Sequence, residues 1–341
     1  MRYIFELNHP KHYYQFKYVM RMLQEHGHEV LVLARDKDVL LNVLNEEDVT
    51  YELFGLHKKK MLQKVFGTFS IIRNYMRIVK RFKPDVIVSK ASLYGCHCAK
   101  HVGCKSVIFP DSEVVKLTNK RVVPLATLVV TPETFGLNYG DKHRRIKGLF
   151  EDCYLVPSVF TADANVVEQY GLEKPYAVFR FVGWFANHDV NNSGFTLEEK
   201  QQLVNAVLPF MHVYLSSENE LPKDLECYKL PTPASMIHSV LSEADLYLGD
   251  SQTMATEAAL LGTPAIRSNS FVGDHDMTNF KVLENKYGLL RNVRDYNDVL
   301  ALVTDFASRS RKQEWMEKRL EYYQHVGDPN RSIVDVLERI N

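Results

Sequence analysis

The chain has 341 residues, which is more than one ordinary hydrophobic core needs and suits two α/β domains of about 150 residues each. Apolar residues make up 45% and charged residues 25%, a balance that is typical of a globular enzyme and excludes a disordered or fibrous chain. Lys plus Arg equals Asp plus Glu, so the formal charge is zero and no global field would attract nucleic acid.

The sequence shows neither a membrane-spanning segment nor a disulfide framework. Its apolar runs, such as LATLVV, fall far short of the roughly 18 residues that a spanning helix needs, and MRYIFELNHP has no signal-peptide pattern. Five scattered cysteines suit a reducing compartment, so we expect a cytoplasmic protein. Cys96, His97, Cys98 and Cys104 are of zinc-ligand type, but Cys-x-Cys lacks the usual two-residue gap. We therefore favour buried thiols on a helix and expect no metal.

Strands and helices alternate along the first half of the sequence. Short apolar or β-branched runs are each followed by helical spacing or a loop, often with Gly or Pro between them. This alternation predicts a parallel sheet with helices on both faces. The predicted strands are YIFEL, HEVLVLA, VTYELF, DVIVS, KSVIF and LATLVV, and the predicted helices lie at 13–26, 39–45, within 58–83 and at 92–101.

A second series of the same kind begins near Tyr176. Thr196, with Glu199 three residues further on, predicts a capping box at the start of its first helix. The predicted strands are YAVFRFV, HVYLS, ADLYLG, PAIRS and GLLRN, and the predicted helices lie at 196–207, directly after Asp250, at 279–286 and at 296–307.

These two series predict an α/β protein with two Rossmann-like, doubly wound parallel-sheet domains that face a cleft. We place the N-terminal domain at 1–160 and the C-terminal domain at 161–325. The last helix, within 326–341, is expected to pack across the domain junction.

The stretch GDSQTMATEAALLGTPAIR, 249–267, carries the most informative signal in the chain. In a parallel sheet, ligands lie beyond the carboxyl ends of strands, where the next helix offers unpaired N–H groups with partial positive charge. That position is occupied by Asp250, Ser251, Gln252 and Thr253. We expect them to bind a diphosphate, with Glu257 one turn beyond to accept the hydroxyls of a ribose. On these residues alone, an ordinary N-cap and a surface carboxylate explain the pattern equally well.

The same stretch resembles the nucleotide-sugar motif of GT-B glycosyltransferases and of UDP-N-acetylglucosamine 2-epimerases, in which a helix after Asp-Ser bears a ribose-binding Glu. Most of the chain is similar to a GT-B family of unsettled reaction that is found beside surface-polysaccharide genes. The segments that carry this likeness are NHP, FPDSE, RFVGWFANHD, GDSQTMATEAALLGTP and NSFVGD. The resemblance implies a GT-B fold, with 1–160 as the acceptor-side domain and 161–325 as the nucleotide-sugar-side domain. It also implies no cofactor, and a nucleotide sugar, UDP-linked, as the substrate.

By position, the resemblance assigns Ser251 and Thr253 to the diphosphate and Glu257 to the ribose. Where the epimerase motif has two glycines, this chain has Gln252 and Thr253, whose side chains narrow the access of phosphate to the backbone. The epimerases also have a Gly-Thr-Arg-Pro-Glu turn after the first strand, and NHPKH stands in its place here. VSKAS also occupies the region where an epimerase would have an acid-bearing turn. The absence of these two turns favours sugar transfer over epimerisation.

The segment FRFVGWFANHDVNNSG follows the first strand of the second domain and leads to the same predicted cleft. Arg180 can neutralise a phosphate, and Trp184 can stack on a base or a sugar. His188 and Asp189 form an adjacent polar pair, although packing and an Asx-turn would also explain this loop. We favour a substrate-binding role for it, and for Ser216 at the end of the next strand.

Three residues of the first domain are candidates for the catalytic base. His9 lies in the first strand-to-helix turn, and an imidazole can take the proton of an acceptor hydroxyl as that hydroxyl attacks the anomeric carbon. Asp111 and Glu113, after KSVIF, are the rival bases. An ordinary hydrogen-bonded histidine is the alternative for His9.

We therefore predict a metal-independent glycosyltransferase that moves a sugar from a nucleotide-diphosphate sugar to a glycan or lipid-linked acceptor in surface polysaccharide synthesis. Helix-end N–H groups, hydroxyls and Arg180 would stabilise the departing diphosphate. The alternatives are a nucleotide-sugar 2-epimerase and a non-catalytic nucleotide-sugar-binding subunit.

The segment 58–83 contains nine Lys or Arg residues and no acid, interleaved with apolar residues. Such a surface could make peripheral contact with an anionic membrane and place the protein at its inner face, which would suit a lipid-linked acceptor. A helix that packs on the sheet through its apolar side, with solvated charges opposite, is the interpretation that we favour.

Overall fold

The structure is a computed structural model in which two compact units, each with one parallel sheet, are described. The first unit comprises Met1–Tyr154 and Gly327–Asn341, and the second comprises Leu155–Val326. The described residues are 1–36, 40–56, 61–113, 115, 120–182, 195–217, 220–274 and 276–340, with the backbone alone described for residues 56 and 61–69.

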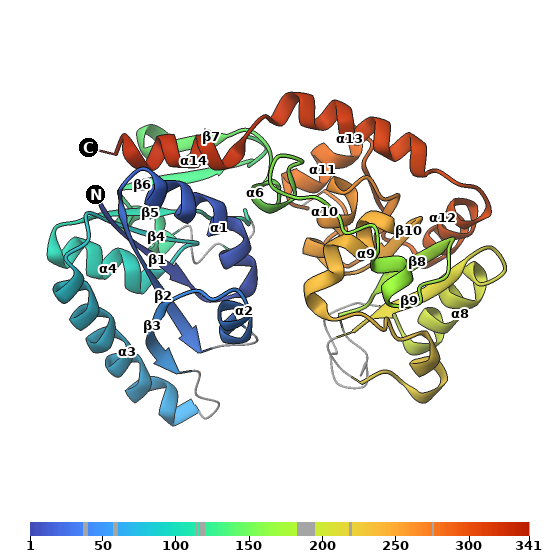
Figure 1. The fold of residues 1–341 in the computed structure, drawn as a ribbon, viewed down its shortest axis with the longest axis horizontal. Coiled ribbons are helices and arrows are strands. Elements are labelled where there is room, and N and C mark those ends of the chain that lie inside the picture. The colour runs from blue at the N-terminus through green and yellow to red at the C-terminus, as the bar shows by residue number, and fades with distance from the viewer. Residues whose placement is uncertain are drawn as a thin grey trace. The chain divides into compact units, whose positions relative to one another are not determined.

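The first unit contains a seven-stranded sheet in the order β3-β2-β1-β4-β5-β6-β7, with parallel pairing throughout (Figure 1). The strand order reverses between β1 and β4, and ligands bind at such a switch point, beyond the carboxyl ends of the strands. The strands are β1 (Arg2–Leu7), β2 (Glu29–Asp36), β3 (Tyr51–Leu56), β4 (Val86–Ser89), β5 (Lys105–Ile108), β6 (Leu128–Pro132) and β7 (His143–Ile146). The helices are α1 (Pro10–Glu25), α2 (Leu40–Glu46), α3 (Met61–Phe82), α4 (Leu93–Val102), α6 (Asp152–Leu155, reaching the second unit) and α14 (Pro329–Glu338), with 3₁₀ turns at Val123–Leu125 and Gly140–Lys142.

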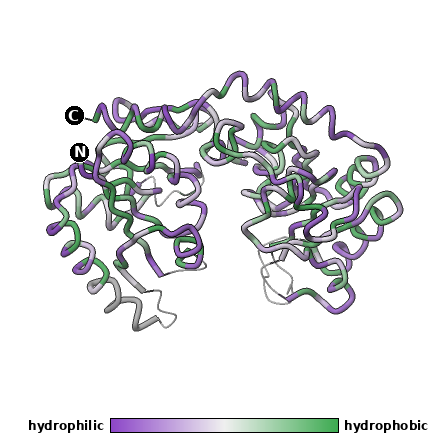
Figure 2. The backbone as a smooth tube through the Cα atoms, viewed as in Figure 1, coloured by the Kyte–Doolittle hydropathy of each residue, from purple (hydrophilic) through white to green (hydrophobic). Residues whose placement is uncertain are grey.

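Both faces of this sheet are buried, because side chains alternate between faces along a strand. Tyr3, Phe5 and Leu7 of β1 pack with α1 and α14, whereas Ile4 packs with α3 and α4. All four residues of β4 are accordingly buried, as expected of a central parallel strand. In Figure 2 the helices alternate purple and green along their length, the pattern of helices with one buried side.

The C-terminal helix α14 belongs to the first unit, although it follows the second unit in sequence. Ile333 and Leu337 join the core beside α1, and the Tyr3 hydroxyl donates to the carbonyl oxygen of Leu337 at 3.2 Å. Asn330 donates through Nδ2 to the Cys153 carbonyl at 2.9 Å. The chain thus returns to its first sheet for its last helix.

The described part of α3 packs on the first sheet through one side. Tyr75 and Val79 are buried, while Ile72, Arg73 and Arg77 are exposed. This is the arrangement that we favoured for the segment 58–83, and contact between its exposed side and a membrane stays a prediction. Among the residues that the structure describes, no helix combines the length and apolar character needed to cross a membrane.

The second unit contains a five-stranded parallel sheet in the order β12-β11-β10-β8-β9, with the order reversing between β8 and β10. The strands are β8 (Tyr176–Arg180), β9 (His212–Ser216), β10 (Leu246–Gly249), β11 (Ala265–Arg267) and β12 (Leu290–Asn292). The helices are α7 (Val166–Gln169), α8 (Leu197–Val207), α9 (Ile237–Glu243), α10 (Gln252–Leu260), α11 (Thr278–Asn285), α12 (Tyr296–Ser308) and α13 (Lys312–Val326), with 3₁₀ turns at Lys223–Tyr228 and Ala234–Met236.

Local sequence signals set the ends of helices in the second unit. The predicted capping box is present: Thr196 Oγ1 accepts from the Glu199 N–H, and the Glu199 carboxylate accepts from the Thr196 N–H. Asp295 caps α12 in a similar way. Gly262 follows α10 with a φ of +76°, and a Cβ there would lie 2.6 Å from Met316 Sδ. A side chain at this position would therefore be strained and would clash with α13.

Two features of the first unit can be compared with its sequence: the edge strand β7 and the cysteines of α4. β7 is not predicted by its sequence, HRRI, because both arginines are exposed on this edge strand and only Ile146 is buried. Cys96 and Cys98 lie on α4 and are buried, which confirms the expected buried thiols. Burial raises the pKa of these thiols to about 11 and about 12.

Candidate functional site

The start of α10 lies at the carboxyl edge of the second sheet. β10 ends at Gly249, and Ser251 is the N-cap of α10, with its Oγ accepting from the Met254 N–H at 3.4 Å. A Cβ at position 249 would lie 2.4 Å from the carbonyl oxygen of Arg180, so only glycine fits there. This close approach brings the helix start, with its outward-pointing N–H groups, beside the end of β8.

Asp250 braces the loops around the helix start. Its Oδ1 accepts from the Val182 N–H at 2.8 Å, and its carbonyl oxygen accepts from Asn269 Nδ2 at 3.1 Å. Burial raises the pKa of the Asp250 carboxyl, against the opposing effects of the Val182 N–H and Lys200. Asp250 thus joins the ends of β8, β10 and β11, and direct contact with a ligand stays a prediction for it.

Two further predicted residues, Arg180 and Ser216, meet at the same edge. Arg180 ends β8, pairs in register with Ser216 of β9, and its Nη1 donates to the Ser216 Oγ at 3.3 Å. Gln252 and Thr253 are partly buried in the first turn of α10, and the Gln252 carbonyl accepts from Thr256 Oγ1 at 3.1 Å. The predicted phosphate-binding residues therefore surround one helix start.

Glu257 is a buried carboxylate, which excludes the surface-charge alternative. Its side chain is 11% exposed, and its Oε1 lies 3.3 Å from Nε2 of His238 on α9, itself 15% exposed. Glu257 follows Thr253 by four residues on one side of α10. Sequence reasoning missed His238, because it lies 19 positions before Glu257 in an otherwise ordinary amphipathic helix.

Trp184, His188 and Asp189 lie outside the described residues, so their predicted roles stay predictions. The described ends of that segment are anchored at the same edge. Val182 donates its N–H to Asp250, and Phe195 packs edge-to-face on Phe181 with ring centroids 5.5 Å apart.

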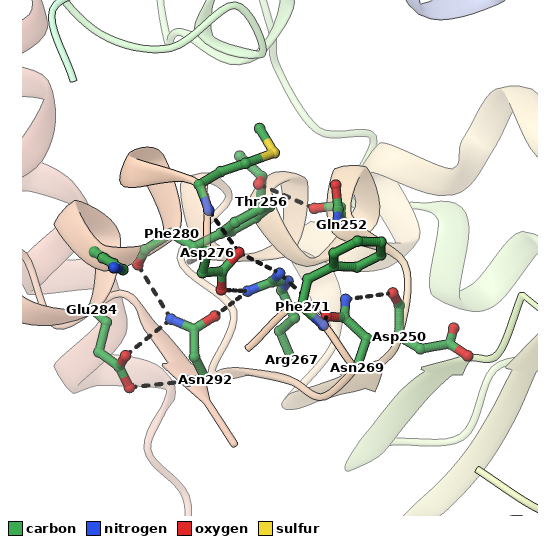
Figure 3. A network of polar contacts seen from close by, with 12 residues as sticks. Asp250, Gln252, Thr256, Arg267, Asn269, Phe271, Asp276, Phe280, Glu284 and Asn292 are labelled. Carbon is green, nitrogen blue, oxygen red and sulfur yellow. Dashed lines mark hydrogen bonds and ion pairs between the residues drawn. The ribbon is translucent and has the colours of Figure 1, made fainter. Parts of the chain in front are cut away.

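A fully buried arginine supports the loop after β11 (Figure 3). The Arg267 guanidinium makes two bonds to the Asp276 carboxylate, Nη1 to Oδ2 at 2.7 Å and Nη2 to Oδ1 at 3.0 Å. Its Nη1 also donates to Asn292 Oδ1 at 2.7 Å, its Nη2 to Asn269 Oδ1 at 3.3 Å, and its Cζ lies 3.6 Å from the Phe280 ring centroid. Since Asn269 also bonds to the Asp250 carbonyl, this network holds the loop beside the α10 start (Figure 3).

A pocket of about 290 Å³ opens beside the same loop. It shares Asn269 with the network around the α10 start. Its mixture of aromatic, hydroxyl, amide and charged groups is the kind that binds a polar small molecule. The lining residues are Phe195, Glu199, Ser268, Asn269, Ser270, Arg294 and Tyr296.

At the carboxyl edge of the first sheet, Lys90 follows β4 and is nearly buried. Its Nζ donates to Gln15 Oε1 at 2.7 Å, lies 3.3 Å from an Asp111 carboxylate oxygen, and lies 4.0 Å from the Phe150 ring centroid. Burial lowers the pKa of the Lys90 ammonium, and Asp111 acts in the opposite direction. Lys90 could have been suspected from its place directly after DVIVS, which matches the place of Asp250 after β10.

Asp111 is held by two lysines. Besides Lys90, Lys11 Nζ lies 3.9 Å from it and pairs with Glu151 at 2.7 Å. Burial by itself would raise the pKa of Asp111, but the two ammonium groups outweigh that effect and hold the pKa below its ordinary value. A carboxylate held ionised in this way is a weak base.

His9 and His12, at the start of α1, each accept a backbone hydrogen bond through their own Nδ1. His9 Nδ1 accepts from the Lys11 N–H at 3.1 Å, and His12 Nδ1 accepts from the Asn8 N–H at 3.2 Å. A backbone N–H can only donate, so in each neutral ring the hydrogen lies on Nε2. His9 would have to give up its N-cap bond to act as a base through Nε2. Burial, with a smaller effect of Lys90, lowers the pKa of His12 to about 3.

Glu113, the third candidate base, is partly buried and accepts from the Gly136 N–H through Oε1 at 2.9 Å. All three candidate bases thus follow strands at the carboxyl edge of the first sheet, and Glu113 is tied to the loop after β6. Nothing in the described residues brings three His, Cys, Asp or Glu side chains together as a metal site would require.

Comparisons with known proteins identify the fold. UDP-GlcNAc 2-epimerase from Methanocaldococcus jannaschii matches with a TM-score of 0.70 and 14% identity, covering 99% of each chain. UDP-GlcNAc 2-epimerase from Neisseria meningitidis, bound to UDP-GlcNAc, matches with a TM-score of 0.70 and 12% identity, covering 99% of this chain and 100% of that chain. MurG from Acinetobacter baumannii matches with a TM-score of 0.63 and 16% identity over the whole of both chains.

The chain therefore has the GT-B fold shared by glycosyltransferases and these epimerases, which confirms the predicted fold class. It belongs to the family described as "Protein of unknown function (DUF354)", whose model matches residues 3–313. A search of curated proteins gave no match. The structural identities lie below 25%, so these likenesses concern the fold and carry no substrate with them.

Proposed function

We propose that this protein is a glycosyltransferase that moves a sugar from a nucleotide-diphosphate sugar to a glycan or lipid-linked acceptor in surface polysaccharide synthesis. The observation that carries the proposal is the arrangement on α10. A capped helix start and a buried carboxylate one to two turns further on lie at the carboxyl edge of a GT-B sheet. That order, anion-binding end first and hydrogen-bond acceptor second, matches a diphosphate followed by a ribose.

The second unit supplies the donor-binding groups in this proposal. The N–H groups in the first turn of α10 lack partners within the helix and bear partial positive charge, which favours a diphosphate. The guanidinium of Arg180 lies on the neighbouring strand end and adds a full positive charge. We propose a metal-independent reaction, because these groups can take up the charge that develops on the leaving diphosphate.

The first unit supplies the base. Glu113 is our choice among the three candidates, because Asp111 is stabilised as an anion and His9 would have to give up its N-cap bond to accept a proton. The bond from the Gly136 N–H to Glu113 engages Oε1, one of two carboxylate oxygens. The Glu113 carboxylate takes the acceptor hydroxyl proton, the hydroxyl oxygen bonds to the anomeric carbon, and the bond from that carbon to the diphosphate oxygen breaks with its electron pair leaving on the diphosphate. A Glu113→Gln change is then expected to lower kcat by about a hundredfold or more with little change in donor affinity.

A nucleotide-sugar 2-epimerase is the second candidate, because two of the structural neighbours carry that activity in their names. An epimerase exchanges the hydrogen at C2 of the sugar with solvent, and a transferase leaves that hydrogen in place. Incubation of the protein with the bound nucleotide sugar in heavy water, without acceptor, therefore separates the two. Deuterium at C2 would establish the isomerase instead.

The donor test is a thermal-shift screen against UDP-, GDP-, CDP- and dTDP-sugars, since a ligand that binds the folded state raises its melting temperature. We expect one nucleotide to stabilise the protein, and Glu257→Ala and Ser251→Ala to lose that shift. Glu226→Ala, an exposed position in the same unit, is the matched control. Equal shifts in all variants would place the nucleotide elsewhere and end the proposal. Binding of a nucleotide sugar without transfer of its sugar to any glycan acceptor would instead indicate a non-catalytic nucleotide-sugar-binding subunit.

A further inference from the structure

The buried pair His238–Glu257 joins two helices at the proposed donor site. His238 is the second residue of α9, and Glu257 lies in the middle of α10. A distance of 3.3 Å separates Nε2 of His238 from Oε1 of Glu257, and both side chains are largely shielded from water. A carboxylate can only accept, so Nε2 carries the hydrogen in this contact whether the ring is neutral or protonated.

Glu257 lies among buried residues, so its contact with His238 bears on how its carboxylate is oriented. Ala255 and Ala258 on α10 are apolar and fully buried, and the hydroxyl of Thr256, which directly precedes Glu257, donates to the Gln252 carbonyl. A buried carboxylate needs hydrogen-bond donors to offset lost hydration, and its direction follows from where the donors lie. A donor that is fixed in position, as His238 is, therefore restricts the rotamers that Glu257 can adopt.

His238 is itself held in place by its own neighbours. The Phe160 ring lies against it edge-to-face, with centroids 6.0 Å apart. The next residue on α9, Ser239, accepts from the Asp163 N–H through Oγ at 3.0 Å. The imidazole is thus mounted on a helix that is tied to the segment before β8, rather than on a loop.

We propose that His238 is the positioning residue for Glu257, and that it orients this carboxylate to accept the 2′- and 3′-hydroxyls of a nucleotide ribose. The inference rests on the proposed donor site and adds the means by which that site recognises a ribonucleotide. His238 acts through Glu257 and need not touch the nucleotide.

The test measures the affinity of the full chain for UDP and for 2′,3′-dideoxy-UDP by titration calorimetry, in the wild type, His238→Phe and His238→Gln. Phe keeps a flat ring but has no donor, whereas the Gln side-chain amide can still donate to the carboxylate. We expect His238→Phe to weaken UDP binding about tenfold, the effect of losing one charge-assisted contact. Binding of the dideoxy compound should be unchanged, and His238→Gln should stay within about threefold of the wild type for UDP.

The outcomes separate this inference from the proposed function. If His238→Phe weakens both nucleotides equally, or neither, the positioning role is wrong while the donor site stands. If the wild type binds UDP and its dideoxy form equally well, Glu257 does not read the ribose and the inference fails. If the wild type binds none of UDP, GDP, CDP and dTDP, the proposed donor site fails, and the inference fails with it.

Discussion

The two sheets differ in where a buried cation lies relative to the predicted site residues, as Lys90 in the first unit and Arg267 in the second unit show. In the first unit, Lys90 lies within the cluster itself, 3.3 Å from Asp111, one of the predicted bases. In the second unit, Arg267 lies behind the helix start and bonds to Asp276, Asn292 and Asn269. The start of α10 itself carries hydroxyls and backbone N–H groups, with the Arg180 guanidinium on the neighbouring strand end.

Because of this difference, we expect substitutions to change stability and ligand binding separately in the second unit but not in the first. At the first edge, two lysines and two carboxylates neutralise one another, so a substitution there changes charge and stability together. At the second edge, stability depends on the Arg267 network, while the groups proposed to bind the ligand lie on α10 and at the end of β8. An edge with balanced charges suits a neutral hydroxyl acceptor, and an edge with exposed helix N–H groups suits an anion.

The largest effect is expected from Arg267→Met. This change leaves the Asp276 carboxylate, 3% exposed, without its cation, and such a loss destabilises by about 3–5 kcal/mol. Urea unfolding followed by tryptophan fluorescence reports on the second unit, because Trp184 and Trp315 both fall within it. Arg309→Met, at an exposed i,i+4 pair, is the control and should cost less than about 0.5 kcal/mol. Equal losses would show that burial of the network does not matter.

Lys90→Met should have a smaller effect on stability and a second effect on charge. The change leaves a buried Gln15 amide oxygen without its donor, but Asp111 is 44% exposed and keeps Lys11, so we expect a loss of about 2 kcal/mol. Removal of the ammonium should also raise the pKa of His12, which can be followed by NMR. Lys100→Met, exposed on α4, is the control. An unchanged pKa of His12 would mean that the Lys90 ammonium does not contribute to lowering it.

The pH dependence of the first unit follows from His12. Its pKa is about 3 in the folded protein and near 6.5 when unfolded, so between these values the unfolded state binds the extra proton. Stability is therefore lost as pH falls from about 6.5 towards 3, at up to about 1.4 kcal/mol per pH unit. Urea unfolding at pH 6 and pH 5, followed by circular dichroism, should show this loss in the wild type and not in His12→Gln. Asp111 acts in the same direction only below about pH 3.9.

Sequence patterns were enough for the fold and for part of the site. Strand–helix alternation, the Thr196 capping box and the helix start after Asp250 are local signals, and each is present as predicted. The partners of the motif at 249–267 are not local. His238 and Glu257 meet through the packing of α9 on α10, and Arg267 reaches Asn292 on the next strand, contacts that depend on how elements pack.

The same limit applies to the first edge. His9 and Asp111 could be placed at strand ends from sequence, but their hydrogen-bonding states could not. Those states depend on the Lys11 N–H, which occupies Nδ1 of His9, and on Lys90, which lies beside Asp111. A pattern therefore supplies candidates, and the neighbours decide which of them can accept a proton.

Ser251 provides the smallest effect and the sharpest separation of stability from binding. Its Oγ caps α10, so Ser251→Ala should cost about 1 kcal/mol of unfolding free energy and also weaken UDP. Asp is as good an N-cap as Ser, so Ser251→Asp should keep the stability, but its negative charge repels a diphosphate and should lower UDP affinity about tenfold or more. Calorimetric titration and urea unfolding of both variants check this. If Ser251→Asp binds UDP as tightly as the wild type, Ser251 only caps the helix and does not lie at the diphosphate. The polar groups of the second edge would then stabilise the fold, as those of the first edge do.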